Sequence, residues 1–336
     1  MTTSFRLGFM THNEGSGDPH RIYADTLTLF VAAEELGFDV AWVAQHHFKE
    51  RAGRLPSPFP FLAAASQRTH RLRLGTAVVI LPLEDSLRVA EDAAVVDALS
   101  GGRLELGVGT GGDPVEFDAF GRSPATRHAL TTSGIELMRC AFRGDPVGSQ
   151  RQCLQPPAPT LGDRLWQGVM SEQSAKNVAV GGLGLLLARS AFGDKPADEL
   201  QLPLVEAYVQ AWHEQGTPAR IGLSRSVYPA ADKQTALASI RTEVMRSVEG
   251  LIAQGQLPAG LSLEQYCSHL NIAYGHPDEV AATLRADRIL PFATDLIVQF
   301  SPAMPPFDEA MRMLEQIARE VAPQLGWKSE AKGDQV

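Results

Sequence analysis

Cysteine is scarce in this sequence. Its three cysteines, Cys140, Cys153 and Cys267, are scattered and form no C-x-x-C pair. An odd number of thiols cannot all pair with one another, and small disulfide-built domains carry them at much higher density. The chain is therefore not a disulfide scaffold. We expect buried or idle thiols in a reducing compartment, with the cytoplasm as the default location.

Long apolar runs and an excess of positive charge are also absent. No apolar stretch approaches the roughly 20 residues needed to cross a bilayer, and the first ten residues contain no signal-peptide core. The chain has 30 Lys and Arg residues and 39 Asp and Glu residues, which gives a formal net charge of −9 spread along the sequence. Such a surface repels phosphate backbones and anionic lipid, so we expect neither a nucleic-acid partner nor a membrane partner.

The chain does have the composition of a soluble globular protein with a large core. Of its 336 residues, 44% are apolar and 21% are charged. This length allows either two domains or one large α/β barrel with insertions.

Short strand-like runs alternate with amphipathic segments along the chain. The predicted strands are residues 5–10, 40–44, 72–80, 104–108, 166–170, 184–188, 221–227 and 295–300. The predicted helices are residues 21–36, 58–69, 86–99, 124–142, 173–180, 198–215, 235–254 and 307–322, with a short additional helix after Pro277. Eight strands, each followed by a helix, predict an α/β fold of the (β/α)8 TIM-barrel type. A doubly wound sheet alternates in the same way but rarely needs eight units.

Two segments interrupt this alternation. Residues 144–163 are rich in Pro and Gly and predict an inserted loop after strand 4, and residues 255–275 predict a second, irregular insertion before strand 8. A minimal barrel takes about 250 residues, so the surplus length fits these insertions better than a second domain. We predict a single barrel domain over residues 1–326, with both loops over the barrel mouth, and a polar C-terminal tail over residues 327–336.

In such barrels the chemistry lies just after each strand. Strand 1 is followed by His12 and strand 2 by Gln45, His46 and His47. Adjacent histidines on a strand continuation point to opposite sides, and no H-x-H, H-E-x-x-H or carboxylate cluster accompanies them, so we predict no metal site. One histidine of the pair should face the barrel mouth, where an imidazole suits proton transfer. The alternative is that both make only structural hydrogen bonds.

Strand 4 ends in glycines that satisfy G-x-G-x-x-G at Gly107, Gly109 and Gly112. A dinucleotide-binding fingerprint also needs an acidic residue about 20 positions on, at the end of the next strand. The next strand-like run here begins only at Trp166. We therefore favour a strand end without side chains, whose backbone a flat ligand can approach.

The fifth strand is followed by a serine pair, Ser171 and Ser174. Ser171 is a good helix N-cap, and free backbone N–H groups beside two hydroxyls form a site that suits phosphate. Simple helix capping is the alternative. Arg127, His128 and Arg189 are basic residues that would suit a phosphate partner.

Motifs for a nucleophile of the protein's own are missing. The sequence contains no nucleophile elbow in a Ser/His/Asp order, no P-loop and no cysteine in an electropositive motif. A proton-transfer residue, a glycine-lined floor and a phosphate pocket together indicate an enzyme that takes its chemistry from a phosphorylated cofactor.

Four longer motifs resemble the bacterial luciferase-like monooxygenases. They are AEELGFD at 33–39, WVAQHHF at 42–48, LGTAVVILP at 74–82 and LSGGRLELGVG at 99–109. The resemblance is specific over residues 1–120, good over 166–189, loose over 201–295, and visible again over 295–325.

The resemblance implies a TIM-barrel flavoprotein that binds FMN at the barrel mouth or, in sister branches, the deazaflavin F420. In the FMN branch, a separate reductase supplies reduced FMN, which reacts with O₂ to give a C4a-hydroperoxide. That species oxidises an aldehyde or another small apolar substrate, so the reaction acts on paired donors with incorporation of O₂. F420-dependent hydride transfer is the alternative activity, and a non-catalytic flavin-binding protein is the alternative of another class. Relatives form homodimers through helices 2 and 3, so a homodimer is implied here as well.

The resemblance also implies site residues. His46 matches the strand-2 histidine that is assigned to proton transfer near the flavin. Ala77 and Val78 fall where the family has a non-proline cis peptide beneath the isoalloxazine ring. Ser171 and Ser174 fall on phosphate-binding residues.

The remaining implied cofactor contacts surround these positions. They are Gly109, Thr110, Arg127, His128 and Met170, of which Arg127 or His128 would be a basic phosphate contact. The sequence departs from bacterial luciferase at two of them, because Thr110 replaces a phosphate-binding arginine and Gly109 replaces a reactive cysteine. Nothing in the sequence supports light emission.

Overall fold

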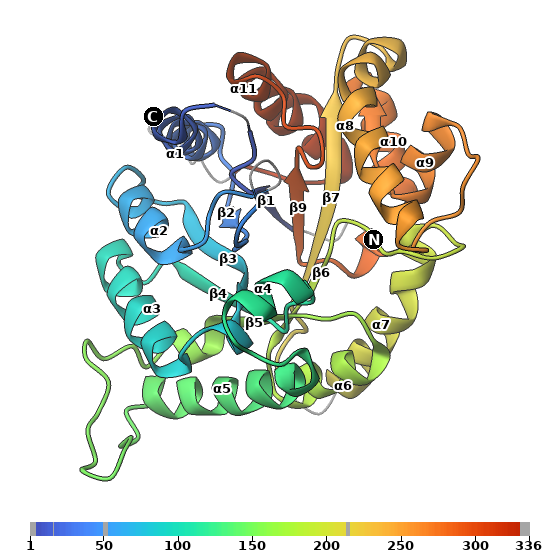
Figure 1. The fold of residues 1–336 in the computed structure, drawn as a ribbon. Helices are drawn as coiled ribbons and strands as arrows, with labels where there is room; N and C mark the ends of the chain where they lie inside the picture. Colours follow the sequence, from blue (N-terminus) through green and yellow to red (C-terminus); the bar gives the residue numbers. More distant parts are fainter. Residues whose placement is uncertain (1–4, 16, 50–52, 213–215, 330–336) are drawn as a thin grey trace. The chain divides into compact units, whose positions relative to one another are not determined.

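The structure, a computed structural model, describes residues 5–15, 17–49, 53–212 and 216–329 (Figure 1). The strands are β1 (Arg6–Thr11), β2 (Val40–Val43), β3 (Arg73–Ile80), β4 (Leu104–Gly109), β5 (Leu165–Gly168), β6 (Gly184–Leu187), β7 (Ile221–Pro229), β8 (Ala273–Gly275) and β9 (Asp295–Gln299). The helices are α1 (Pro19–Glu35), α2 (Pro58–Ser66), α3 (Ser86–Ser100), α4 (Pro114–Ala119), α5 (Arg127–Phe142), α6 (Glu172–Val180), α7 (Ala197–Trp212), α8 (Lys233–Ala253), α9 (Leu263–His269), α10 (Pro277–Ala286) and α11 (Phe307–Gln316).

The strand order confirms the predicted fold class. In the described part of the chain the strands pair in the order β6-β5-β4-β3-β2-β1-β9-β7-β8, and a further pairing joins β6 to β7. Eight of these nine strands therefore form the closed ring of a (β/α)8 barrel. The other strand, β8, adds to the end of β7, where Val227 pairs with Ala273 and Pro229 pairs with Gly275.

By its internal contacts the chain divides into two compact units. The first unit comprises Met1–Thr11, Val31–Val40 and Val169–Val336, and the second comprises His12–Phe30 and Ala41–Gly168. The assignment of residues 1–326 to a single domain stays a prediction.

The second unit is built on the parallel strands β3, β4 and β5, in which Leu74 pairs with Leu104 and Leu106 pairs with Leu165. Helices α2, α3 and α5 cover the outer side of these strands, and α3 packs against both of the others (Figure 1). The rings of Trp42 and Trp166 are fully buried and meet edge to face, with centroids 5.8 Å apart. Apolar packing thus holds the strands whose ends carry the predicted site.

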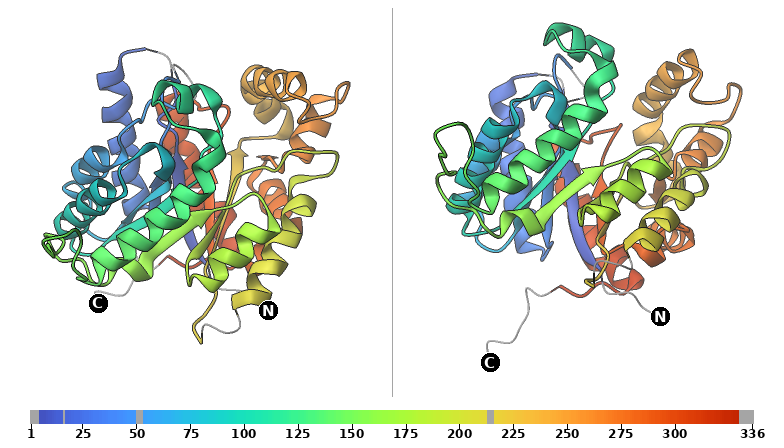
Figure 2. Two further views of the ribbon diagram at one scale, coloured as in Figure 1. Left: turned by 60° about the horizontal axis from the view of Figure 1, so that its bottom comes forward. Right: turned by 90° about the horizontal axis from the view of Figure 1, so that it is seen from below.

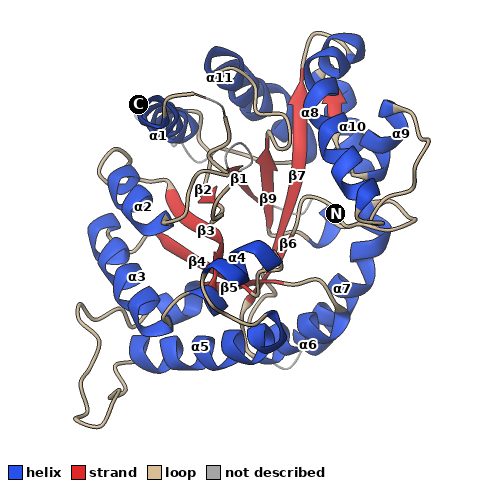
Figure 3. Cartoon of the chain, viewed as in Figure 1, coloured by secondary structure: helices blue, strands red, loops and turns tan. Residues whose placement is uncertain are grey.

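The first unit is built on β1, β9, β7 and β6. Strand β9 lies between β1 and β7, because Asp295 pairs with Arg6 on one side and with Gly222 on the other. Helices α8, α10 and α11 lie beside β7 and β9 (Figure 3).

A buried ion pair joins several elements of the first unit. Arg225 on β7 is completely buried, and its Nε donates to Asp287 Oδ2 at 2.6 Å. Its other N–H groups donate to the Gln201 side chain and to the carbonyls of Ala188 and Ser224. A charge removed from water in this way needs these partners, since the alternative is an uncompensated buried cation.

The two predicted insertions differ in structure. In 144–163, an isolated antiparallel bridge joins Val147 to Gln152, and a short 3-10 turn forms at Leu161–Arg164. This segment connects the end of α5 to the start of β5 as a long loop (Figure 2). It therefore lies at the amino ends of the strands, and its predicted place over the barrel mouth is wrong. In 255–275, the structure has helix α9 and strand β8 where the sequence predicted irregular chain. Ser262 and Gln265 form a capping box there, which was the sequence signal for a helix start.

Two other local predictions differ from the structure. The glycine-rich loop after β4 continues into the unpredicted helix α4, which Asp113 caps and in which Pro114 occupies the first turn. Trp327, predicted to begin the polar tail, is buried and donates its indole N–H to Asp39 Oδ2 at 2.9 Å. No helix among the described residues is both long and apolar enough to span a membrane.

The Arg225–Asp287 pair gives a stability prediction. Asp287→Ala leaves the buried guanidinium without its carboxylate, so the free energy of unfolding should fall by about 3–5 kcal/mol in urea denaturation. The matched control is Arg88→Ala, which removes the exposed pairs of Arg88 with Glu91 and Asp92 and should cost no more than about 1 kcal/mol. Equal losses in the two variants would contradict the account.

Candidate functional site

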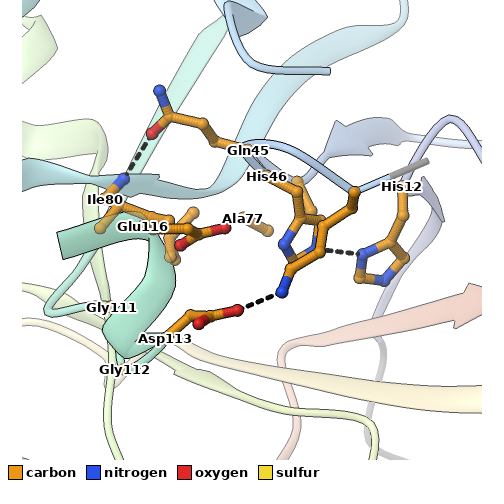
Figure 4. A pocket seen from close by; sticks show the side chains of 12 residues that line it. His12, Gln45, His46, Ala77, Ile80, Gly111, Gly112, Asp113 and Glu116 are labelled. Carbon is orange, nitrogen blue, oxygen red and sulfur yellow. Dashed lines mark hydrogen bonds and ion pairs between the residues drawn. The ribbon is translucent and has the colours of Figure 1, made fainter. Parts of the chain in front are cut away.

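A cavity of about 320 Å³ lies at the carboxyl ends of β2, β3 and β4, the end of the barrel that carries the chemistry in this fold (Figure 4). Its volume is at the lower end of the range for small-molecule pockets, about 300–1,000 Å³. All of its lining residues belong to the second unit. The apolar part of its wall consists of Ala44, Ala77, Val78 and Ile80, and the backbone of Gly111 and Gly112 borders it.

Ala77 and Val78 form a floor of small side chains. They are half-buried, and the peptide bond between them is cis, as the family resemblance implied. A Cβ added at Gly109 would lie 2.5 Å from Val78 Cγ2, and one added at Gly168 would lie 3.4 Å from Val78 Cγ1. The glycine at the end of β4 therefore provides room for Val78. This is a more specific role than the open approach to the backbone that the sequence suggested.

Gln45 connects the floor to the segment that carries the histidines. Its backbone N–H donates to Val78 O at 3.3 Å, and its side-chain oxygen accepts from the N–H of Ile80 at 2.7 Å. Its amide nitrogen donates to Pro56 O at 2.9 Å and to Glu84 Oε1 at 2.6 Å. Sequence reasoning assigned no role to Gln45, although its place beside His46 at a strand end was the available signal.

His46 lies against the cavity with a fixed ring orientation. Its Nε2 is 2.9 Å from Nδ1 of His12, and the two rings stack with centroids 5.1 Å apart. A Cβ at Gly53 would lie only 2.4 Å from His46 Cδ2, so this glycine allows the chain to pass along that edge of the ring. The edge of the His46 ring that carries Nδ1 lies on the side of Ala77 (Figure 4). His47, by contrast, is buried, and its ring meets Phe120 edge to face at 4.7 Å.

The environment of His46 favours its neutral form. Burial is the main cause that lowers the pKa of His46, to about 4. Electrostatic interactions with Lys49 and His47 lower it further, while Asp113 acts in the opposite direction. A neutral imidazole carries one N–H donor and one lone pair, so at neutral pH His46 can donate one hydrogen bond and accept another, and the lone pair is the place where it can take up a proton.

Helix α4 is tied to the residues after β2. Lys49 pairs with Asp113, the N-cap of α4, and this hydrogen bond is the main cause that lowers the pKa of Asp113. The backbone N–H of His47 donates to Glu116 Oε1 at 3.0 Å. These two contacts place a cation and two carboxylates around the cavity.

The other predicted contacts of the second unit lie elsewhere. Thr110 is half-buried directly after β4, and Arg127 begins α5, where Nη1 donates to Pro124 O at 3.4 Å. His128 is exposed on the same helix. None of these three side chains is among the described residues that line the cavity.

The predicted phosphate residues belong to the first unit. Ser171 caps α6, where its hydroxyl oxygen accepts from the N–H of Ser174 at 3.3 Å and lies 3.0 Å from the Ser174 hydroxyl. Met170 is 67% exposed beside them. The helix end thus presents backbone N–H groups and hydroxyls to solvent, an arrangement that suits an anion. Among the described residues, no group of His, Cys, Asp or Glu is arranged to hold a metal ion.

The charges around His46 give the second prediction. Lys49→Met removes a cation that lowers the pKa of His46, so that pKa should rise from about 4 toward its ordinary value. An NMR titration of the His46 ring measures it. Arg88→Met, which removes an exposed cation from α3, should leave the titration unchanged. An unchanged or lower pKa in Lys49→Met would show that Lys49 does not act on this ring.

Comparison with known proteins identifies the family of this chain. The chain matches the luciferase-like monooxygenase family over residues 3–289. A stretch of 112 residues is 38% identical to 4-hydroxyprotoasukamycin monooxygenase of Streptomyces nodosus subsp. asukaensis, covering 33% of this chain and 30% of that protein. The chain spans less than half the length of the first curated relatives that it matches.

Two solved structures share the fold over nearly the whole chain. One is the oxygenating constituent of 3,6-diketocamphane monooxygenase from Pseudomonas putida, in complex with FMN, with a TM-score of 0.77, 17% identity and coverage of 96% of this chain and 99% of that one. The other is the coenzyme F420 dependent tetrahydromethanopterin reductase from Methanopyrus kandleri, with a TM-score of 0.69, 17% identity and coverage of 96% and 100%. The match along the sequence, the barrel and the strand-end cavity together show that this chain belongs to the luciferase-like monooxygenase family.

Proposed function

We propose that this protein is an FMN-dependent monooxygenase that uses reduced flavin and O₂ to oxidise a small apolar organic substrate. The observation that carries the proposal is the cavity in which a floor of small side chains, Ala77 and Val78, lies beside His46. Membership of the family and the likeness to an FMN-bound monooxygenase support it.

The residues of the cavity fit the ring system of a flavin. Ala77 and Val78 offer a flat apolar surface, and Gly111 and Gly112 border it without side chains. When bound, reduced flavin supplies the electrons that activate O₂. The chain's own residues support the ring, exclude water from its apolar face, and hold or move a proton at Nδ1 of His46.

A phosphate group fits the start of α6. Ser171 and Ser174 would donate their hydroxyls to it, together with backbone N–H groups of the first helical turn. Arg127 and His128 are the basic residues that the family resemblance implies as phosphate contacts, and Thr110 would offer a hydroxyl in place of the arginine of bacterial luciferase. Gly109 acts through the room that it leaves for Val78, and Met170 would contact the cofactor beside the serines.

F420-dependent hydride transfer is the second candidate function, and the likeness to an F420-dependent reductase favours it. A non-catalytic flavin-binding protein is the candidate of another class. The proposal includes a separate flavin reductase and a homodimer, which the family resemblance implies.

The third prediction tests the function itself. Titration with FMN, reduced FMN and F420 should show binding of reduced FMN, and addition of a flavin reductase, NADH and medium-chain aldehydes should give O₂-dependent oxidation of the aldehyde. Because His46 carries the proton, His46→Ala should bind reduced FMN but lower kcat by about 10²–10⁴-fold. Binding of F420 with O₂-independent hydride transfer would replace the proposal, and binding of either cofactor without turnover would support the non-catalytic alternative.

The fourth prediction tests the phosphate site. Replacement of Ser171 and Ser174 by Ala removes two donors to a charged group, which should weaken FMN binding by at least about tenfold. Binding of riboflavin, which lacks the phosphate, should not change. Gln173→Ala on the same helical turn is the control, since Gln173 bonds Asn177 at the surface. An equal loss of affinity for FMN and riboflavin would refute the phosphate assignment.

A further inference from the structure

We propose that His12 is a positioning residue that acts through His46: it fixes the orientation of the His46 ring and passes protons between that ring and solvent. The inference rests on the proposed function, because it assigns a proton path to the same cavity. Its starting point is the contact of 2.9 Å between Nδ1 of His12 and Nε2 of His46. The two histidines are 34 positions apart in the chain and follow β1 and β2.

The hydrogen bond determines the tautomer of both rings. Only one hydrogen can lie between the two nitrogens, and a neutral imidazole has one donor and one acceptor. When His12 accepts, His46 carries its hydrogen on Nε2 and presents a lone pair at Nδ1 toward the cavity. When His12 donates, Nδ1 of His46 carries the hydrogen instead. The pair therefore offers the cavity either a base or an acid.

Proton movement through the pair is balanced. A proton taken up at Nδ1 of His46 is accompanied by transfer of the Nε2 hydrogen to Nδ1 of His12, and the hydrogen on Nε2 of His12 then leaves to water. Both rings end neutral in the opposite tautomer, and the reverse passage, which delivers a proton to the cavity, restores the first state. No bond other than N–H forms or breaks, and nothing is oxidised or reduced.

Burial and the charged groups around His46 explain why a second ring, that of His12, is needed to carry the proton away. Lys49 and His47 follow the same strand as His46, and α4 contributes Asp113 and Glu116 to the wall of the cavity. Asp113 is paired with Lys49, and Glu116 accepts the backbone N–H of His47. Burial disfavours a lasting positive charge on His46. His12 is half-buried and lines the cavity, so it can relieve His46 of that charge.

The fifth prediction concerns the variant His12→Asn, measured alongside the full-length wild-type protein. The Asn amide can bond Nε2 of His46 but cannot carry a proton onward, so kcat should fall by at least about tenfold and acquire a different pH profile. The affinity for reduced FMN should stay within about threefold. Added imidazole should restore part of the activity of His12→Ala. His20→Asn, an exposed histidine on α1, is the control and should behave as wild type.

Each outcome decides the inference. Wild-type kcat and pH profile in His12→Asn, or failure of imidazole to restore His12→Ala, would overturn the relay. Loss of FMN binding in His12→Asn would assign His12 a structural role only. If the wild-type protein itself does not bind or use FMN, the proposed function fails instead. In that case ¹⁵N NMR of His46 still tests the hydrogen bond, because removal of His12 should change the tautomer balance of the ring, and an unchanged balance would refute the contact.

Discussion

The hydrogen bonds of one buried amide, that of Gln45, hold the candidate site together. The side chain of Gln45 bonds Ile80 N, Pro56 O and Glu84, so the ends of β2 and β3 and the segment beyond them are joined through a single residue. A buried polar group whose donors and acceptor are all used is rigid, because any displacement leaves one of them unpaired. The floor at Ala77 and Val78 and the ring of His46 therefore keep a fixed relation to each other.

Two glycines complete this arrangement. Gly109 leaves room for Val78, and Gly53 leaves room for the edge of His46. The hydrogen bond to His12 then fixes the rotation of the His46 ring. Preorganisation of this kind lowers the cost of binding a flat ligand and of placing a proton donor or acceptor beside it. The proposed flavin chemistry depends on a site that is formed before the cofactor arrives.

The barrel was predictable from the sequence because its cause is local. Each strand and helix shows its own periodicity, and the count of units then selects the fold. Helix α4 escaped prediction because it is short and follows a glycine-rich run, although Asp113 and Pro114 are ordinary start signals. Helix α9 and strand β8 were not predicted for a similar reason. Helix α9 has seven residues and β8 has three, which is too few to establish a hydrophobic period.

The residues of the site were only partly predictable. The position of His46 at a strand end, the resemblance and the cis peptide pointed to the same place on the barrel. The partners of His46 and Lys49 were not predictable, because His12 and His46 are 34 positions apart and Lys49 and Asp113 are 64 positions apart. The predicted barrel places the ends of these strands near one another, but no local pattern encodes which side chains after different strands point toward each other.

The central claim is that the floor of Ala77 and Val78 receives a flavin ring beside His46. A crystal structure of the protein with bound FMN tests this claim most directly. We expect the isoalloxazine ring to lie against these two residues, with Nδ1 of His46 on the flavin side of the imidazole. A ring bound outside this cavity, with the floor covered by other side chains, would contradict it.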